Sequence, residues 1–393
     1  MLNFKDETTI YYPVPETFPD PRARFIQIIN TALAIANKGY KIKLLIGKRR
    51  GVTVEDMLEF YGLDPHHNLE IVLLPMLRRE NASFLRVSWH GVFNIFLLIY
   101  LFRLRKDAGV IILRHLKLAR LLLRCNKVLQ TPLLFEVHEI FHLSIKDSEK
   151  VNKLKRLEER VYGHVNGLFV LTEQLKQCLK ELLSITETPI FFIPHAVKGE
   201  WFKEINSFDH GKYICYAGSL YPWKGVDCII RAMKYLPGEI LYIIGGGTRL
   251  EEIKNLAKKE GVEERVRFLG RMPHDAVRDY LLKAKVAVLP NTKEGPSSVS
   301  SPLKLFEYMA CGLPIVASDL PGFREILTHG KNALLFEPES PKALADRIQA
   351  LFNKPSFARK IAAQARRDVE AFTYDKRAER IVAAIKEILR NSV

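Results

Sequence analysis

Two charged residues in an otherwise apolar helical segment are the strongest candidates for chemistry in this sequence. The segment reads SPLKLFEYMACG. Ser301 followed by Pro302 predicts a helix start at about Pro302, because serine can accept a hydrogen bond from an early backbone N–H and proline needs no donor there. Lys304 then places a cation in the first turn, and Glu307 places a carboxylate among apolar neighbours. Departures of this kind from local preference are typical of functional sites.

This pair of charges could bind a phosphate group and sugar hydroxyls. A helix N-terminus with free N–H groups beside a lysine attracts an anion, and a carboxylate one turn deeper can accept hydrogen bonds from hydroxyls. The alternative is an ordinary i,i+3 pair of Lys304 and Glu307 on a solvated helix face. The residues by themselves leave both interpretations open.

A second candidate motif, H-E-x-x-H, spans His138 to His142. The zinc-protease chemistry that uses this pattern needs both histidines on one face of a helix, a third ligand and a free metal position. Here the motif directly follows the predicted strand 133–137, at the end of the strand where a ligand cleft is expected. An ordinary buried histidine is the alternative for His138. No D-x-D motif occurs in the sequence, so we predict no metal and no cofactor.

The net charge of +16 predicts acidic partners, such as phosphorylated substrates, an anionic membrane or nucleic acid. Five basic residues fall on one predicted helical stripe: Arg114, Lys117, Arg120, Arg124 and Lys127. Such a stripe is typical of an interfacial helix attracted to anionic lipid, particularly if Trp89, Phe93 or Phe96 also reaches the interface. An ordinary solvated helix face is the alternative.

Length, cysteines and the N-terminus favour a cytoplasmic protein with two domains. A chain of 393 residues can form two cores of ordinary size. The five cysteines are widely spaced and contain no C-x-x-C pair, which favours a reducing compartment. The N-terminus lacks the apolar core of a signal peptide, and the most apolar window, 91–102, is too short to span a bilayer.

Alternating strand and helix patterns predict two doubly wound parallel sheets, an α/β fold. The first has predicted strands at 8–14, 41–46, 69–74, 110–113, 133–137, 167–171 and 190–193, with a helix at 23–38. The second has predicted strands at 213–217, 240–244, 266–269, 286–289 and 314–318, with helices at 226–235, 250–260, 275–284 and 302–311. Three helices, 341–353, 356–372 and 375–391, close the chain. We therefore predict domains at 1–205 and 206–372 and a final helical segment at 373–393.

Ligands of such sheets bind at the carboxyl ends of the strands, so the loops that follow strands are the expected site. The loop GSLYPWKG at 218–225 brings Lys224 to that position, and GGGT at 245–248 lets the backbone approach a ligand closely.

At these residues the sequence resembles the large retaining glycosyltransferase family 4, which has the GT-B fold. The resemblance rests on SPLKLFEYMACGLPIVASDLPGFREIL, YAGSLYPWKGVD, FIPHAV and the segment from YIIGGGT to FLGRMP, and it is strongest from about residue 213 onward. It implies transfer of a sugar from a nucleotide-sugar donor, held mainly by the C-terminal domain, to an acceptor held mainly by the N-terminal domain. It also implies that the final helix crosses back onto the first domain.

The resemblance assigns roles to individual residues. Lys224 matches the lysine that holds the donor diphosphate, Glu307 the second glutamate of the E-x7-E motif, and His138 the histidine near the transferred sugar. The residues that the resemblance places at the donor are Gly218, Ser219, Gly246, Arg271, Met272, Ser300, Ser301, Leu303 and Lys304.

Three departures from the family pattern leave the donor open. Val299 stands where the first glutamate of E-x7-E is expected, and Ser219 stands where the family places a diphosphate arginine. The segment PETFPDPRAR at 15–24 replaces a glycine-rich loop. The motif SPLKLFEYMA also resembles one branch of the family. That resemblance implies that Ser301 and Lys304 take over part of the phosphate and sugar contacts.

The sequence thus predicts a metal-independent retaining glycosyltransferase that uses a UDP-, GDP- or ADP-sugar and a glycan or lipid-linked acceptor. The expected role is cell-envelope polysaccharide or glycolipid synthesis without nucleic acid. The expected location is the cytoplasm, with peripheral attachment to the inner face of the cell membrane left open. The alternatives are a GT-B sugar-nucleotide epimerase and a non-catalytic basic protein that binds lipid or nucleic acid.

Overall fold

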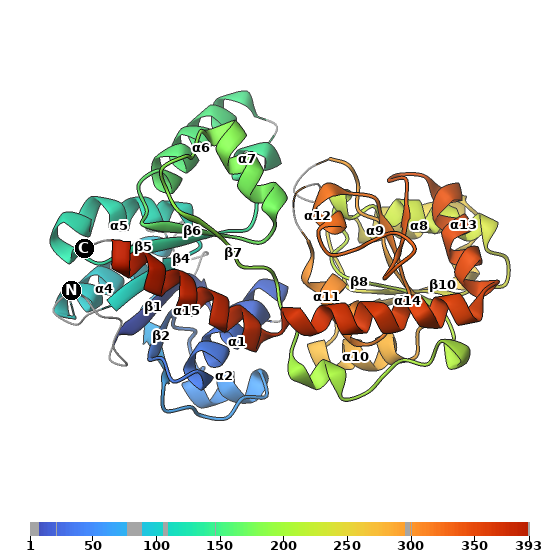
Figure 1. The fold of residues 1–393 in the computed structure, drawn as a ribbon, viewed down its shortest axis with the longest axis horizontal. Helices are drawn as coiled ribbons and strands as arrows, with labels where there is room; N and C mark the ends of the chain where they lie inside the picture. Colours follow the sequence, from blue (N-terminus) through green and yellow to red (C-terminus); the bar gives the residue numbers. More distant parts are fainter. Residues whose placement is uncertain are drawn as a thin grey trace. The chain divides into compact units, whose positions relative to one another are not determined.

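The computed structural model describes residues 8–20, 22–76, 89–104, 109–145, 147–294, 299 and 301–391. The chain forms two compact units, each built on one parallel β-sheet flanked by helices (Figure 1). Unit 1 comprises Met1–Leu171, Lys176–Pro194 and Tyr374–Val393, and unit 2 comprises Thr172–Leu175 and His195–Thr373.

The sheet of unit 1 has seven strands in the order β3-β2-β1-β4-β5-β6-β7. Their bounds are β1 (Thr9–Thr17), β2 (Ile42–Gly47), β3 (Leu69–Leu74), β4 (Gly109–Leu113), β5 (Leu133–Val137), β6 (Gly167–Val170) and β7 (Ile190–Phe192). All neighbouring pairs are parallel. The chain winds outward from β1 to β3 and then returns to the other side of β1, so the switch point lies between β1 and β4.

The helices that accompany this sheet fall between its strands and at the end of the chain. They are α1 (Ala23–Asn37), α2 (Val54–Phe60), α4 (Trp89–Arg103), α5 (Leu116–Leu129), α6 (Ser148–Tyr162), α7 (Glu173–Leu183) and α15 (Tyr374–Asn391). The last of them, α15, packs against α1 within unit 1, as the dark red and blue helices in Figure 1 show. No helix among the described residues is both long enough and apolar enough to span a bilayer.

The sheet of unit 2 has six strands in the order β10-β9-β8-β11-β12-β13, again all parallel. Their bounds are β8 (Ile214–Ala217), β9 (Leu241–Ile244), β10 (Val266–Gly270), β11 (Val286–Leu289), β12 (Ile315–Ser318) and β13 (Leu334–Phe336). The helices of this unit are α8 (Val226–Ala232), α9 (Leu250–Lys259), α10 (His274–Leu282), α11 (Leu303–Ala310), α12 (Pro321–Arg324), α13 (Pro341–Phe352) and α14 (Pro355–Asp368).

Both faces of this second sheet are buried, which explains why its strands read as continuous apolar runs. In β8, Ile214 and Tyr216 join one apolar cluster, with residues of α8, α9 and α13. Cys215 and Ala217 point the other way and join a second cluster, with residues of α10 and α11. Alternate side chains of one strand therefore pack under helices on opposite faces.

These observations confirm the predicted fold class. Every strand predicted from the sequence is present, and β13 is an additional strand that the sequence analysis did not predict. In unit 2 the switch point lies between β8 and β11, and ligands of doubly wound sheets bind at the carboxyl ends of such strands.

Candidate functional site in unit 2

The loops that follow β8 and β9, at 218–225 and 245–248, pack tightly against each other through Gly218 and Gly245. We call this pair of loops the glycine floor. Gly218 follows β8 with φ +149°, a conformation that favours glycine. A Cβ atom on Gly245 would lie 2.0 Å from the carbonyl oxygen of Gly218, so only glycine lets the two loops approach this closely. The Tyr216 hydroxyl donates a hydrogen bond of 2.7 Å to the Ser219 carbonyl, which fixes the start of the loop.

Hydrogen bonds hold helix α11 at the carboxyl end of β8. The hydroxyl of Tyr308 accepts a hydrogen bond of 2.8 Å from the backbone N–H of Ala217 and lies 3.3 Å from the carbonyl of that residue. Because Tyr308 is fully buried, this contact holds the first turns of α11 beside the loop after β8.

Lys304, in the first turn of α11, is a buried lysine without a hydrogen-bond partner among the described residues. It is only 8% exposed, and its Nζ lies 3.6 Å from the centre of the Tyr216 ring. A Cβ atom on Gly218 would lie 3.0 Å from this Nζ, so the amine rests directly on the glycine floor. Burial lowers the pKa of Lys304 well below its ordinary value, the nearby Lys224 lowers it further, and Glu307 acts in the opposite direction.

Ser301 does not cap α11, contrary to the sequence prediction. The helix begins at Leu303, and Pro302 is the N-cap residue, with extended backbone angles and no side chain that could cap. Ser301 therefore lies one residue too early to reach the first-turn N–H groups. Its hydroxyl is buried and has no hydrogen-bond partner among the described residues, as the Lys304 amine has none. Ser300, which the resemblance also placed at the donor, lies outside the described residues.

Glu307 is 6% exposed and pairs with a histidine that the sequence analysis did not identify. Nε2 of His274 lies 2.7 Å from Oε1 of Glu307, and the ring of His274 packs at 4.9 Å from that of Trp201. The alternative of a solvated Lys304–Glu307 pair is wrong, because both side chains are buried and Glu307 pairs with His274 instead. The available signal was the segment PHD, which places His274 at the start of α10, but 33 residues separate it from Glu307.

Four further residues predicted to lie at the donor belong to this unit, three of them in the connections after strands and one in α11. Lys224 ends the short 3-10 helix η4 (Pro222–Lys224), and Gly225 follows it with φ +62°. Arg271 lies over the second glycine loop, because a Cβ atom on Gly246 would be 3.3 Å from its Nε. Met272 is half-buried and packs against the apolar cluster under α11. Leu303 is buried in the first turn of α11.

His138, which the resemblance placed near the transferred sugar, belongs to a buried charge network of unit 1. Glu136 accepts a hydrogen bond of 2.7 Å from the Tyr12 hydroxyl and pairs with Arg377. Nε2 of His138 lies 3.3 Å from Oε1 of Glu136, and its Nδ1 lies 3.3 Å from Nη2 of Arg114. Burial and the charge of Arg114 lower the pKa of His138 and Glu136 raises it, for a net pKa of about 4, so the ring is neutral near pH 7.

The H-E-x-x-H segment does not form the helix that a zinc protease needs. Its second half belongs to the short 3-10 helix η1 (Phe141–Ser144), which starts after His138. His142 is buried and its Nδ1 lies 2.6 Å from Oε2 of Glu158. That carboxylate also accepts hydrogen bonds from the backbone N–H groups of Phe141 and His142. In the part of the chain that the structure describes, no cluster of three histidine, cysteine or acidic side chains could hold a metal ion.

The predicted basic stripe is reduced to four residues. Helix α5 begins at Leu116, so Arg114 precedes it, and its side chain is 14% exposed and lies 3.7 Å from Glu136. Assigning Arg114 to the stripe was therefore wrong. Phe93 is fully buried and cannot reach an interface. The four residues of the stripe that are exposed on α5 are Lys117, Arg120, Arg124 and Lys127.

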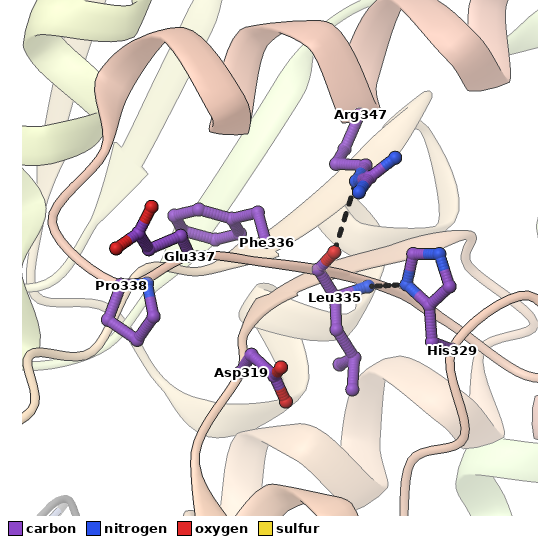
Figure 2. Close-up of a pocket in the computed structure, with 7 residues that line it drawn as sticks. All are labelled: Asp319, His329, Leu335, Phe336, Glu337, Pro338 and Arg347. Carbon is purple, nitrogen blue, oxygen red and sulfur yellow. Dashed lines mark hydrogen bonds between the residues drawn. The ribbon is translucent and has the colours of Figure 1, made fainter.

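The open pocket in Figure 2 lies at the outer edge of the second sheet, and its polar side chains hydrogen-bond the backbone of the edge strand. Its volume is about 360 Å³. The backbone N–H of Leu335 in edge strand β13 donates to Nδ1 of His329 at 2.9 Å, and Nε of Arg347 donates to the Leu335 carbonyl at 3.1 Å (Figure 2). Asp319 pairs with Arg324. His329 and Arg347 thus occupy the backbone N–H and carbonyl of Leu335 at the sheet edge, a typical way of protecting an edge strand from pairing with another strand.

Residues 197–368 match the family model described as Glycosyl transferases group 1. An exopolysaccharide phosphotransferase from Streptomyces coelicolor is 33% identical over 216 residues, which cover 54% of this chain and 22% of that protein. The chain therefore spans about a fifth of the length of that relative.

Solved structures share the fold over nearly the whole chain. Sucrose-phosphate synthase from Thermosynechococcus elongatus has a TM-score of 0.79 at 18% identity, covering 98% of this chain and 100% of that one. HepE from Anabaena, solved in complex with UDP-glucose, has a TM-score of 0.72 at 15% identity, covering 96% and 99%. Residues 197–368 thus resemble glycosyl transferases group 1, and the chain has the GT-B fold of known glycosyltransferases.

Proposed function

We propose that this protein is a retaining glycosyltransferase of family 4 whose unit 2 binds a nucleotide-sugar donor. The observation that carries the proposal is the buried amine of Lys304, which has no acceptor among the described residues and rests on the glycine floor. A buried lysine with three potential N–H donors and no acceptor is strongly disfavoured, whereas a diphosphate would supply the missing acceptors. The Glycosyl transferases group 1 match covers all of these residues.

In the proposed donor site, one group of residues binds the diphosphate and another binds the hydroxyl groups of the ribose or the sugar. Lys224, Lys304 and the buried Ser301 hydroxyl bind the diphosphate, and Gly218 and Gly246 let its oxygens approach the backbone. Glu307 accepts hydrogen bonds from hydroxyls of the ribose or the sugar through the oxygen that His274 does not hold. Bound UDP-glucose in the neighbour HepE supports a nucleotide diphosphate sugar as the ligand class.

The proposed reaction retains the anomeric configuration. The acceptor hydroxyl attacks C1 on the face from which the diphosphate leaves, and the lysines stabilise the charge that develops on the leaving phosphate. A charge contact of this kind is worth about 3 kcal/mol in the transition state. No step requires a metal ion.

A donor panel tests this function. We expect one of UDP-, GDP- or ADP-glucose, or the matching N-acetylglucosamine donors, to transfer sugar to lipid-linked glycan extracted from cell envelopes, and NMR should show a retained anomer. Glu307→Gln should lose most of this activity, whereas Glu251→Gln, on an exposed carboxylate of the same unit, should keep it. Transfer with inversion, or equal activity of Glu307→Gln, would contradict the proposal.

Experiments can distinguish the proposed transferase from two alternative functions. An epimerase would convert the nucleotide sugar without any acceptor, so an epimeric nucleotide sugar formed from donor alone would favour it. A basic lipid- or nucleic-acid-binding protein would bind its ligand with a steep salt dependence that survives Lys224→Ala and Glu307→Ala.

We further propose that the protein works at the inner face of the cell membrane, on a cell-envelope acceptor. Helix α5 exposes Lys117, Arg120, Arg124 and Lys127. The neighbouring α4, which contacts α5, exposes the apolar side chains Ile95, Phe96 and Ile99, which are 58%, 43% and 43% exposed. Basic residues beside exposed apolar ones suit an anionic bilayer surface, where each cation contributes about 1 kcal/mol.

Vesicle co-sedimentation tests the membrane proposal. We expect binding to vesicles with anionic lipid at low salt, little binding to neutral vesicles, and loss of binding as salt rises. Arg120→Glu with Arg124→Glu should abolish it, while Lys153→Glu, on an exposed residue of α6, serves as the matched control. Equal binding to both lipids would leave α5 as an ordinary solvated helix.

A further inference from the structure

The Lys304 amine lies near another lysine, and the carboxylate that acts on it, Glu307, already pairs with a histidine. Tyr216 presents its ring face, and the backbone of Gly218 lies against Nζ. Lys224, from the loop after β8, is near enough for its charge to act on Lys304. The nearest opposing carboxylate, Glu307, is engaged by His274. The other titratable groups beside this amine are the thiol of Cys215 in β8 and the hydroxyl of Tyr216, and burial raises the pKa of both.

An ammonium group at this position would be buried with three unsatisfied N–H groups and a second lysine nearby. The quadrupole of the Tyr216 ring offsets only a small part of that cost. Because burial disfavours the charged form of an amine that has no acceptor, the neutral amine is favoured in the absence of a ligand. The lowered pKa of Lys304 agrees with this geometric argument.

We propose that Lys304 is uncharged in the empty site and takes up one proton when the diphosphate of the donor binds. In this step the amine lone pair accepts a proton from a buffer acid, the conjugate base returns to solution, and the resulting ammonium donates hydrogen bonds to phosphate oxygens. The inference rests on the proposed donor site. It adds that anion binding and protonation of a buried lysine are one coupled event.

This coupling has a consequence for binding at different pH. If the empty site holds the neutral amine, the dissociation constant for a fully ionised nucleoside diphosphate should rise about tenfold for each unit of pH above neutrality. Removal of the neighbouring cation by Lys224→Ala should make protonation of the empty site easier and so reduce the proton uptake.

Isothermal titration calorimetry tests the proposal directly. UDP, GDP and ADP are titrated at pH 8, where their phosphates are fully ionised, in two buffers with different ionisation enthalpies. For whichever nucleotide binds, we expect uptake of about one proton per complex. Lys304→Met should still fold, because it replaces a buried amine by an apolar chain of similar length, and its residual binding should take up no proton. His274→Gln should retain the uptake, which excludes the His274–Glu307 pair as its source.

The outcomes separate this inference from the proposed function. Binding without proton uptake in the wild-type protein, or equal uptake in Lys304→Met, would overturn the protonation of Lys304 and leave the donor site intact. If Lys304→Met does not fold, Lys304→Gln gives the same comparison. Failure of all three nucleotides to bind the wild-type protein would overturn both the donor site and the coupling.

Discussion

Replacement of Arg377 by methionine should strongly destabilise unit 1. Its guanidinium, 1% exposed, lies between the C-terminal helix α15 and the first sheet. It donates to Thr31 Oγ1 at 3.1 Å and to the Ile193 carbonyl at 2.8 Å, and it also bonds the Pro194 carbonyl and the Glu136 carboxylate. Methionine would fill much of the same volume but could satisfy none of these acceptors.

The expected loss of stability follows from the Glu136 carboxylate, which stays buried after Arg377 is removed. Burial by itself would raise the pKa of Glu136, yet Arg377 and Arg114 together hold it well below its usual range. Removal of one partner of a buried pair typically costs 3–5 kcal/mol. Because Arg114 stays 3.7 Å from the carboxylate, we expect the lower end, about 3 kcal/mol.

Urea denaturation followed by circular dichroism measures this loss. Lys376→Met is the matched control on the same helix, because Lys376 is exposed and its ion pair with Glu379 lies at the surface, so it should change stability by less than about 0.5 kcal/mol. Adding Glu136→Gln to Arg377→Met should recover part of the loss, since the unpaired charge disappears. A loss equal to that of the control, or no recovery, would refute the reasoning.

Three further predictions concern the site and its environment. Lys224→Ala should lower kcat/KM about a hundredfold, as loss of a transition-state charge contact does, and near-wild-type kinetics would remove Lys224 from the mechanism. Transfer activity should persist in EDTA, and its loss followed by recovery with zinc or magnesium would reopen a metal-dependent mechanism. Burial lowers the pKa of His138 to about 4, below the ordinary 6.5. The neutral ring therefore stabilises unit 1 above pH 6.5, and about 2 kcal/mol should be lost by pH 5. Urea unfolding at pH 7 and pH 5 should show a smaller difference for His138→Gln than for the wild type.

The sequence predicted the elements well, because each sheet is buried on both faces and its strands are apolar runs between helical patterns. The sequence analysis missed β13 because its three residues, Leu334–Phe336, form an apolar run too short for periodicity alone to identify as a strand. Strand order could not be predicted from periodicity, since it depends on which strands pair in space.

The site was predicted less completely, because burial and pairing are set by tertiary packing. The pattern showed that Lys304 and Glu307 break the local rules, but not that both are buried or that His274 holds Glu307. Arg114 was assigned to a helical stripe because its spacing continues that of α5, yet the helix begins two residues later and Arg114 turns toward Glu136. Arg377 looked like one of many charges on an amphipathic helix.

A crystal structure with a bound nucleoside diphosphate tests the central claim most directly, because it locates the ligand relative to α11 without relying on the unknown acceptor. Whichever of UDP, GDP and ADP binds should place its diphosphate oxygens within about 3 Å of the Lys304 amine, with ribose or sugar hydroxyls on Glu307. A nucleotide bound away from the glycine floor and α11, with Lys304 still lacking an acceptor, would contradict the account.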